Sequence, residues 1–185
     1  IQDKQAGTLI QLGMLAEREQ KWRMAEKYYK DALKITINLN LGYEQSGILH
    51  QLGMLAEKEH KWKTAEEYYK GALKITINFN LNYEQAKTLH QLGEVVEKQS
   101  QFKTAEKYYK KALKIIVELN CRKEQAFTLY HLGILAEKNH DWKAATEFAL
   151  ESLEIYVQYQ NRNCLRMVLH SLARIFKKSK NVNII

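Results

Sequence analysis

Three histidines at one repeated position are the residues of this sequence best suited to metal chemistry. His50, His90 and His170 are separated by multiples of forty residues, and a neutral imidazole is a common zinc ligand. Corresponding residues on stacked helices lie about 8–10 Å apart, whereas a zinc–nitrogen bond is about 2 Å long. We therefore expect no metal at this row. Two others, His60 and His140, fall in predicted turns, where we expect them to be solvated.

Other arrangements of catalytic residues are missing from the sequence. It contains no Gly-rich phosphate-binding pattern, no H-E-x-x-H motif and no Ser or Cys with a plausible paired base. The two cysteines, Cys121 and Cys164, cannot form a disulfide framework and lack C-x-x-C spacing, which indicates free thiols in a reducing compartment. We expect a cytoplasmic protein that is not an enzyme and carries no cofactor.

A pair of adjacent tyrosines recurs every forty residues and could supply a row of phenols. The pair lies in the segments AEKYYKDALKI at 25–35, AEEYYKGALKI at 65–75 and AEKYYKKALKI at 105–115. At 100° per residue, Ala25, Tyr29 and Ala32 share one helical face, and Tyr28 points about 100° away toward a second neighbour. Aromatic residues at helical spacing are usually core. The pattern therefore favours packing over phenol chemistry. We expect Gly13 and Ala32 to let two helix backbones approach closely, while Tyr29 fills the space beside them.

The helices that position these residues repeat as a unit of forty. Leu9, Leu12, Gly13 and Ala16 form one stripe of a first helix, and the same residue types return at intervals of forty residues. The second helix of each of the first three units carries the tyrosine pair. We expect no separate domains but a single array, divided into repeats 1–40, 41–80, 81–120 and 121–160, followed by a capping helix and basic tail at 161–185.

The spacing Leu9, Leu12, Gly13, Ala16, Trp22, Ala25, Tyr29, Ala32, with its A-x-x-Y-Y-x-x-A-L run, resembles the tetratricopeptide repeat signature. The fourth copy departs from it at Ala149 and Ser152. The period of forty is similar to that of kinesin-light-chain-like repeats. The resemblance implies an all-α fold, a right-handed α-solenoid of antiparallel helix pairs with four TPR-like repeats and a C-terminal capping helix. It also implies a concave groove, formed mostly by first helices, that holds an extended peptide or a partner helix.

Candidate partner-binding residues lie on the first helices, next to the core stripe, where amide, imidazole and methionine side chains suit adaptable contacts. They are His50, Gln51, Met54, Lys87, His90, Gln91, Glu94, Phe127, Tyr130, His131 and Ile134. We expect His90 and Gln91 to be little buried. The apolar patch of Phe127, Tyr130 and Ile134 has two interpretations, packing under the fifth first helix or contact with a ligand.

The tail is predicted to cap the array. Residues 164–178 place Leu165, Leu169, Leu172 and Phe176 on one side of a helix, and terminal units of repeat proteins need a polar outer face. We expect these four side chains to cover the second helix of the fourth repeat.

The charge pattern leaves alternatives open. The net charge is +8, but residues 161–185 hold six basic side chains and no acidic one, so the basic end is local. Our main hypothesis is a non-enzymatic scaffold for a protein or peptide ligand, part of a longer protein. The alternatives are a sensor or regulatory array of a bacterial signalling NTPase or protease, and a nucleic-acid-binding module, which Glu57, Glu94, Glu97 and Glu137 disfavour. Self-association stays open, and no segment predicts membrane insertion.

Overall fold

Nine α-helices and no strand make up residues 2–182, the part of the chain that this computed structural model describes. The chain falls into two compact units that meet between Gln101 and Phe102, and each is described by itself. The first unit contains α1 (Gln2–Arg18), α2 (Trp22–Asn38), α3 (Gly42–Lys58), α4 (Trp62–Asn78) and α5 (Asn82–Lys98). The second contains α6 (Phe102–Glu118), α7 (Arg122–Lys138), α8 (Trp142–Gln158) and α9 (Arg162–Val182).

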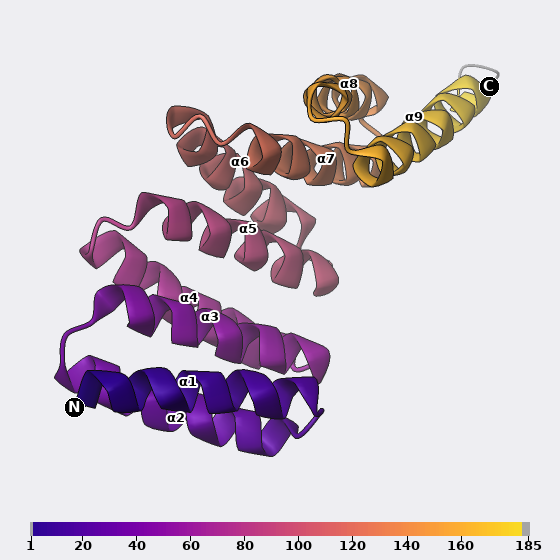
Figure 1. Cartoon of the computed structure of the whole chain (residues 1–185). Coiled ribbons are helices and arrows are strands. Elements are labelled where there is room, and N and C mark those ends of the chain that lie inside the picture. The colour runs from indigo at the N-terminus through magenta and orange to yellow at the C-terminus, as the bar shows by residue number, and fades with distance from the viewer. Residues whose placement is uncertain (1, 183–185) are drawn as a thin grey trace. The chain divides into compact units, whose positions relative to one another are not determined.

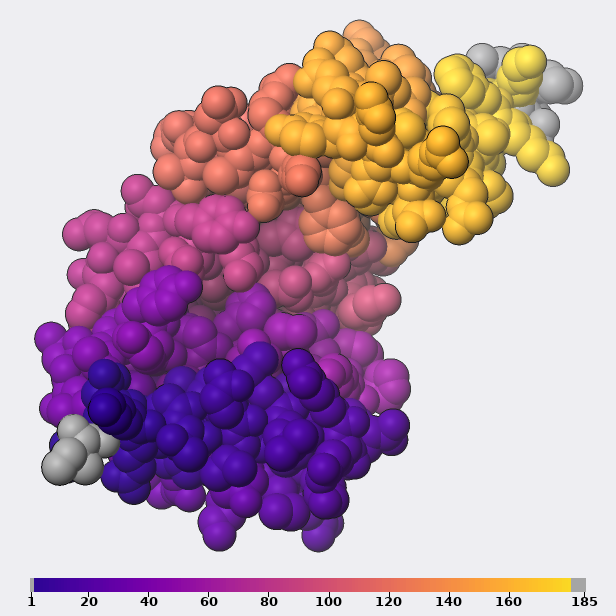
Figure 2. All heavy atoms as spheres, in the orientation of Figure 1, coloured from indigo at the N-terminus to yellow at the C-terminus, as the bar shows by residue number. Residues whose placement is uncertain are grey.

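Neighbouring helices pack in antiparallel pairs because short connections reverse the chain. In the first unit α1 packs on α2 and α3 on α4, while α3 also contacts α2 and α5 (Figure 1). In the second unit α7 packs on α6 and α8, and α9 on α8. Side chains fill the spaces between the ribbons (Figure 2). The predicted fold class, an all-α solenoid of helix pairs, is confirmed, whereas a single continuous array stays a prediction. No helix between residues 2 and 182 is long and apolar enough to cross a membrane.

Each of the eight connections contains one residue in the left-handed region, and none of these residues is glycine. The amide after this residue bonds to a carbonyl five positions back, as from Lys21 to Ala16 at 2.8 Å and from Leu41 to Thr36 at 3.0 Å. This closure satisfies carbonyls at the helix end. The left-handed residues, with φ between 51° and 62°, are Gln20, Asn40, His60, Asn80, Ser100, Asn120, His140 and Gln160. His60 and His140 were predicted in turns, and the structure confirms that placement.

We expect His60→Gly to be more stable than His60→Ala by about 1 kcal/mol, the usual cost of a left-handed conformation for a residue with a Cβ. Both variants remove the edge contact between the imidazole and Trp62, whose ring centroids are 5.4 Å apart. The comparison therefore isolates the backbone effect. Urea denaturation of the two variants measures the difference. Equal midpoints would show that the connection relaxes when its side chain changes.

The tyrosines at the second position of each pair form the core, as predicted. Tyr29 and Tyr69 are fully buried. A methyl group on Gly13 would lie 2.6 Å from the ring of Tyr29, and one on Gly53 would lie 2.6 Å from the ring of Tyr69. The hydroxyl of Tyr29 donates a hydrogen bond of 2.9 Å to Glu17. Burial raises the pKa of both phenols above the ordinary value. Both phenols are therefore neutral at physiological pH, and these tyrosines act in packing rather than as acids or bases.

The buried face of α9 differs from the predicted one. Val168, Leu172 and Ile175 are buried and pack in the core of the second unit, whereas Leu169 is 53% and Phe176 is 51% exposed. The prediction was therefore wrong for these two side chains. Leu169 occupies the repeat position of Leu49, and Leu49 packs on Gly71 of the helix that follows it. Among the described residues, no helix follows α9 to play that part.

In the first repeat, one residue of the predicted packed stripe is exposed, because the described residues include no helix that could cover it. Leu12 is 38% exposed, but Leu52 is 1% exposed. Leu52 shares a core cluster with Ala25 and Tyr29 of the preceding helix, α2. The structure describes no helix before α1, so Leu12 has no equivalent neighbour. The expectation that Leu12 belongs to the packed stripe was wrong.

Candidate partner-binding surface

The first helices of the first unit present a half-buried polar row beside their core stripe. On α3 the buried residues Ile48, Leu52 and Leu55 face the core, and His50, Gln51 and Met54 are half-buried next to them. A helix turns about 100° per residue, so positions one or two residues from the core stripe lie at its edge. These three side chains are therefore partly buried and partly accessible to solvent.

A pocket of about 280 Å³ opens between α1, α3 and α5. It brings together three predicted residues, His50, Gln51 and Lys87. The pocket is also lined by Ile10, Tyr43, Glu44, Ser46, Gly47, Ile48, Glu84 and Thr88. The acidic and aromatic members were not predicted, because their positions look like ordinary solvated helix surface. The sequence feature that marks this place is Gly47, a mid-helix glycine with no turn to explain it.

His50 is held neutral at physiological pH. Its imidazole meets the ring of Tyr69 edge to face, with the centroids 5.3 Å apart. Burial, and then the charge of Lys87, lower the pKa of His50 to about 4. The pocket therefore contains a neutral imidazole that offers one donor and one acceptor.

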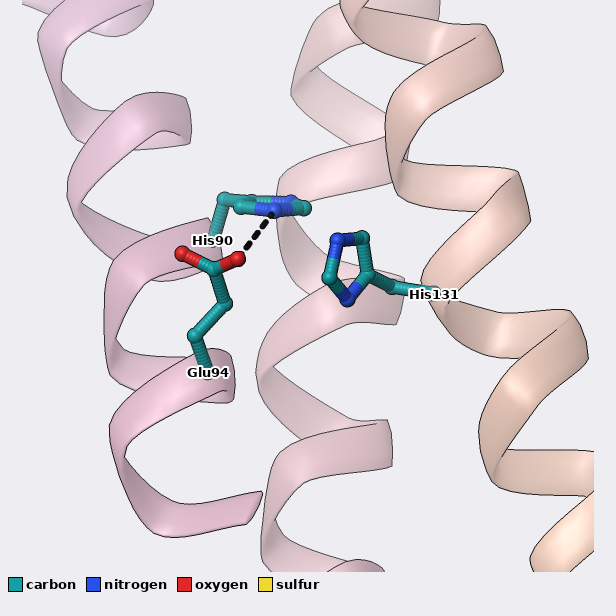
Figure 3. A group of neighbouring side chains, drawn as sticks. All are labelled: His90, Glu94 and His131. Atoms are coloured by element: carbon teal, nitrogen blue, oxygen red, sulfur yellow. Dashed lines mark ion pairs between the residues drawn. The ribbon is translucent and has the colours of Figure 1, made fainter. Parts of the chain in front are cut away.

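His90 on α5 is 5% exposed, so the expectation that it is little buried was wrong. Leu89 next to it is also buried, whereas the corresponding Leu49 and His50 of α3 are half-buried. A ring nitrogen of His90 lies 3.9 Å from a carboxylate oxygen of Glu94, one turn along the same helix (Figure 3). Gln91 is half-buried, and its role on a binding groove stays a prediction.

Glu94 makes the first unit sensitive to pH. Burial, and then repulsion by Glu57 and Glu97, raise the pKa of Glu94 to about 7. When the pKa of a carboxyl is higher in the folded state than in the unfolded chain, the free energy of unfolding falls as the pH rises between the two values. Folding stability should therefore fall from about pH 4.5 to pH 7.

We expect Glu94→Gln to be more stable than the parent protein at pH 8 by on the order of 2 kcal/mol, since an amide need not ionise in the buried site. At pH 4 the two proteins should be equally stable, because the carboxyl is then protonated in both states. Urea midpoints at the two pH values measure the effect. Glu67→Gln, on an exposed position of α4, is the matched control. An equal gain at pH 4 would mean that the amide acts by packing and not by its lack of charge.

The predicted residues of α7 divide between packing and exposure. Tyr130 packs against the core cluster that includes Val168 and Leu172 of α9, which favours the packing interpretation for this side chain. Phe127 is 39% exposed and meets the ring of His131 with centroids 4.8 Å apart. Ile134 is half-buried. An accessible aromatic edge therefore remains on the second unit at Phe127.

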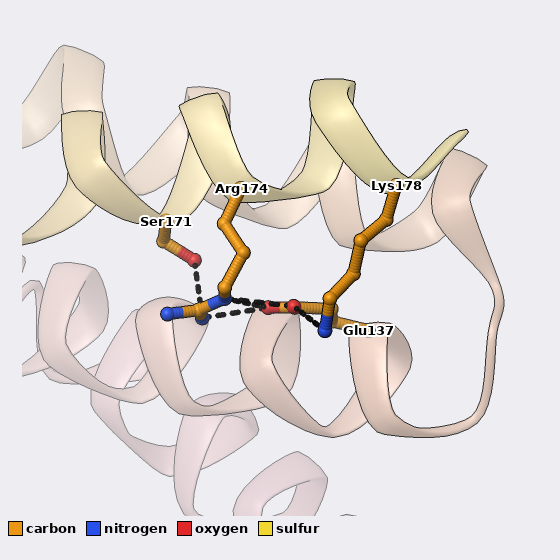
Figure 4. A network of polar contacts seen from close by, with 4 residues as sticks. All are labelled: Glu137, Ser171, Arg174 and Lys178. Carbon is orange, nitrogen blue, oxygen red and sulfur yellow. Dashed lines mark hydrogen bonds and ion pairs between the residues drawn. The ribbon is translucent and has the colours of Figure 1, made fainter. Parts of the chain in front are cut away.

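Glu137, farther along α7, is covered by side chains of α9. It is 6% exposed and accepts hydrogen bonds from Nε and Nη2 of Arg174 at 2.7 and 2.6 Å and from Nζ of Lys178 at 3.0 Å (Figure 4). The Arg174 guanidinium holds the pKa of this carboxyl below its usual range. The six basic residues of the tail were predicted only as a local excess of charge, yet two of them, Arg174 and Lys178, hold Glu137 through charge-assisted hydrogen bonds.

Comparison with models of protein families shows to which family the chain belongs. Two models of the tetratricopeptide repeat family match it, one over residues 8–41 and the other over residues 44–116, which together make up more than half of its length. The chain belongs to the tetratricopeptide repeat family. No curated protein matches the sequence.

Solved structures show the same TPR fold at low sequence identity. BtubC (BKLC) from P. vanneervenii is 23% identical with a TM-score of 0.85, and the match covers 97% of this chain and 74% of BtubC. Aspartyl phosphate phosphatase F from Bacillus subtilis is 12% identical with a TM-score of 0.89, over 100% of this chain and 48% of that protein. The TPR-like repeats of a putative kinesin light chain from Podosopora anserina are 13% identical with a TM-score of 0.79, over 98% of this chain and 89% of theirs. The chain thus spans about half the length of the phosphatase.

Proposed function

We propose that this TPR protein is a non-enzymatic, cytoplasmic scaffold that binds an extended peptide or a partner helix along the first helices of its repeats. The observation that carries the proposal is the pocket of about 280 Å³ between α1, α3 and α5, which gathers His50, Gln51 and Lys87. Pockets lined by apolar walls and a few convergent polar groups are the usual form of a binding site.

The row on α3 and α5 supports an extended ligand. Gln51 and Gln91 occupy the same position in successive repeats, and an amide can donate and accept hydrogen bonds along a peptide backbone. Met54 adds a side chain that adapts its shape to apolar ligands. Among similar folds is a Rap protein complexed with competence and sporulation factor, 15% identical with a TM-score of 0.79.

Site-specific photocrosslinking tests the proposal. A photoreactive residue replaces Gln51 or Gln91 on the first helices, or Lys27 or Lys107 on exposed positions of the second helices. Crosslinks to one cellular protein from the first pair, absent from the second pair, are the expected result. The reverse pattern would move the binding surface to the second helices. Retention of nucleic acid on filters that falls steeply with salt would favour the nucleic-acid alternative instead.

A second candidate is a regulatory array within a signalling protein. It is favoured by the likeness to apo RapI, which has a TM-score of 0.87 and 18% identity, over 97% of this chain and 66% of RapI. The same groove would then hold a signal instead of a permanent partner. Reading the coding region on both sides of this segment tests it, because the candidate requires an output domain in the same protein or the adjacent gene.

A further inference from the structure

We propose that the pocket between α1, α3 and α5 takes the side chain of an arginine from the bound partner. The inference rests on the proposed function and names the chemistry that one part of the groove selects. It follows from the shape of the pocket, from its charges and from one exposed aromatic ring.

The floor of the pocket suits a long side chain with an apolar stem. Ile10 and Ile48 supply apolar wall, on which the methylene groups of arginine can lie. A methyl group at Gly47 would meet no atom within 4 Å, so the space above this helix turn is open because the residue has no side chain. The pocket volume of about 280 Å³ is several times the volume that one water molecule occupies in the liquid, which is about 30 Å³.

The ionisable groups of the pocket leave an excess of negative charge. Glu44 and Glu84 both line it, and among the described residues neither forms an ion pair. The one basic lining residue is Lys87, whose Nζ lies 5.7 Å from the ring centroid of Tyr83. The neutral state of His50 leaves two carboxylates against one ammonium group. A cation on the ligand would therefore be attracted and an anion repelled.

The aromatic ring favours arginine over lysine. Tyr43 is 61% exposed at the edge of the pocket, and a guanidinium plane stacks on such a face while keeping its donors free. Carboxylates accept the parallel N–H groups of a guanidinium, which an ammonium group cannot offer. The hydroxyls of Ser46 and Thr88 already donate to backbone carbonyls within their own helices, so His50 and Gln51 are left to contact the peptide backbone.

The experiment uses short blocked peptides as probes. Acetyl-Gly-Ser-Arg-Ser-Gly-amide is titrated into the isotope-labelled full chain, and backbone NMR shifts report its dissociation constant. Peptides with citrulline, lysine or glutamate at the centre are titrated in parallel. We expect saturable shifts in the N-terminal halves of α3 and α5 for arginine, roughly tenfold weaker binding for citrulline, in line with the loss of charge-assisted bonds, and none for glutamate. Citrulline that binds as well as arginine would overturn the proposal.

Two glycine variants separate binding from folding. Gly47→Leu fills the pocket, and Gly7→Leu makes the same change at the equivalent position of α1, where a methyl group also meets nothing within 4 Å. Both variants should fold with unchanged or higher melting temperatures, because leucine is the better helix former. Only Gly47→Leu, and the double variant Glu44→Gln with Glu84→Gln, should lose the arginine response.

An arginine response that survives Gly47→Leu would place the site elsewhere and refute the proposal. The photocrosslinks at Gln51 and Gln91 answer a different question. If they persist while arginine is not preferred, the scaffold function stands and the inference about arginine fails. If arginine binds the pocket and no crosslink forms, the pocket has its predicted specificity while the extended groove has no role.

Discussion

Replacing Tyr69 by Ala should lower the free energy of unfolding by about 3–5 kcal/mol, the range found when a buried aromatic side chain is truncated. Tyr69 is fully buried, and its ring lies so close to Gly53 that a methyl group there would be 2.6 Å away. The truncation removes this packing and leaves Glu57, which accepts a hydrogen bond from the phenol, without its donor. Thermal and urea denaturation should show a large loss with or without a ligand present.

Two further variants define what this loss means. Tyr69→Phe keeps the ring and removes only the hydroxyl, so we expect a cost of about 1 kcal/mol. Tyr43→Ala removes a ring that is 61% exposed and should change stability by no more than about 0.5 kcal/mol. A Tyr69→Ala protein that melts like the parent would contradict the repeat packing itself.

Deleting residues 162–185 should destabilise the second unit by on the order of 5 kcal/mol and cause aggregation. The α9 side chains that pack in the core are Val168, Leu172 and Ile175. Burial of each contributes about 1.5–3 kcal/mol to the free energy of unfolding. Their removal exposes the apolar cluster around Leu129 and Tyr156. Size-exclusion chromatography and thermal denaturation of the shortened chain measure both effects.

Adjacent point variants give a matched control for the deletion. Ile175→Asp places a charge in the buried face of α9, whereas Phe176→Asp places the same charge at a side chain that is 51% exposed. We expect the first to reproduce the instability of the deletion and the second to leave the melting temperature almost unchanged. The opposite order would mean that α9 packs through the face predicted from the sequence.

The sequence was sufficient to predict the helices, their pairing and the tyrosine core, because each depends on side chains a few residues apart. The 3.6-residue period selects the buried face of each second helix, and Gly13 and Gly53 mark the places where a ring must fit. The left-handed connections at residues such as His60 and Ser100 could not be predicted in the same way. Their usual signal is glycine or asparagine, and five of the eight positions carry neither.

The candidate pocket was less predictable because it depends on residues that are far apart in the chain. Ile10, Gly47 and Glu84 come from three different helices, and the space beside Gly47 is open. Repeat alignment also misleads at the ends of the described chain. It assigns Leu12 and Leu169 the burial of internal copies, although burial depends on a neighbouring helix and not on the residue itself.

Glu137 and Ala149 together make the fourth repeat different in kind from the first two. In those copies a tyrosine of the second helix donates to a glutamate of the first, as from Tyr29 to Glu17. In the fourth copy Ala149 stands at the tyrosine position, and Glu137 accepts from Arg174 and Lys178 instead. The tyrosine–glutamate bond lies within each of the first two modules, so recombination could duplicate either module without losing that bond, whereas the partners of Glu137 lie outside the fourth module, on α9. Growth of such a protein by unequal crossing-over would add copies in the interior and leave the final module in place.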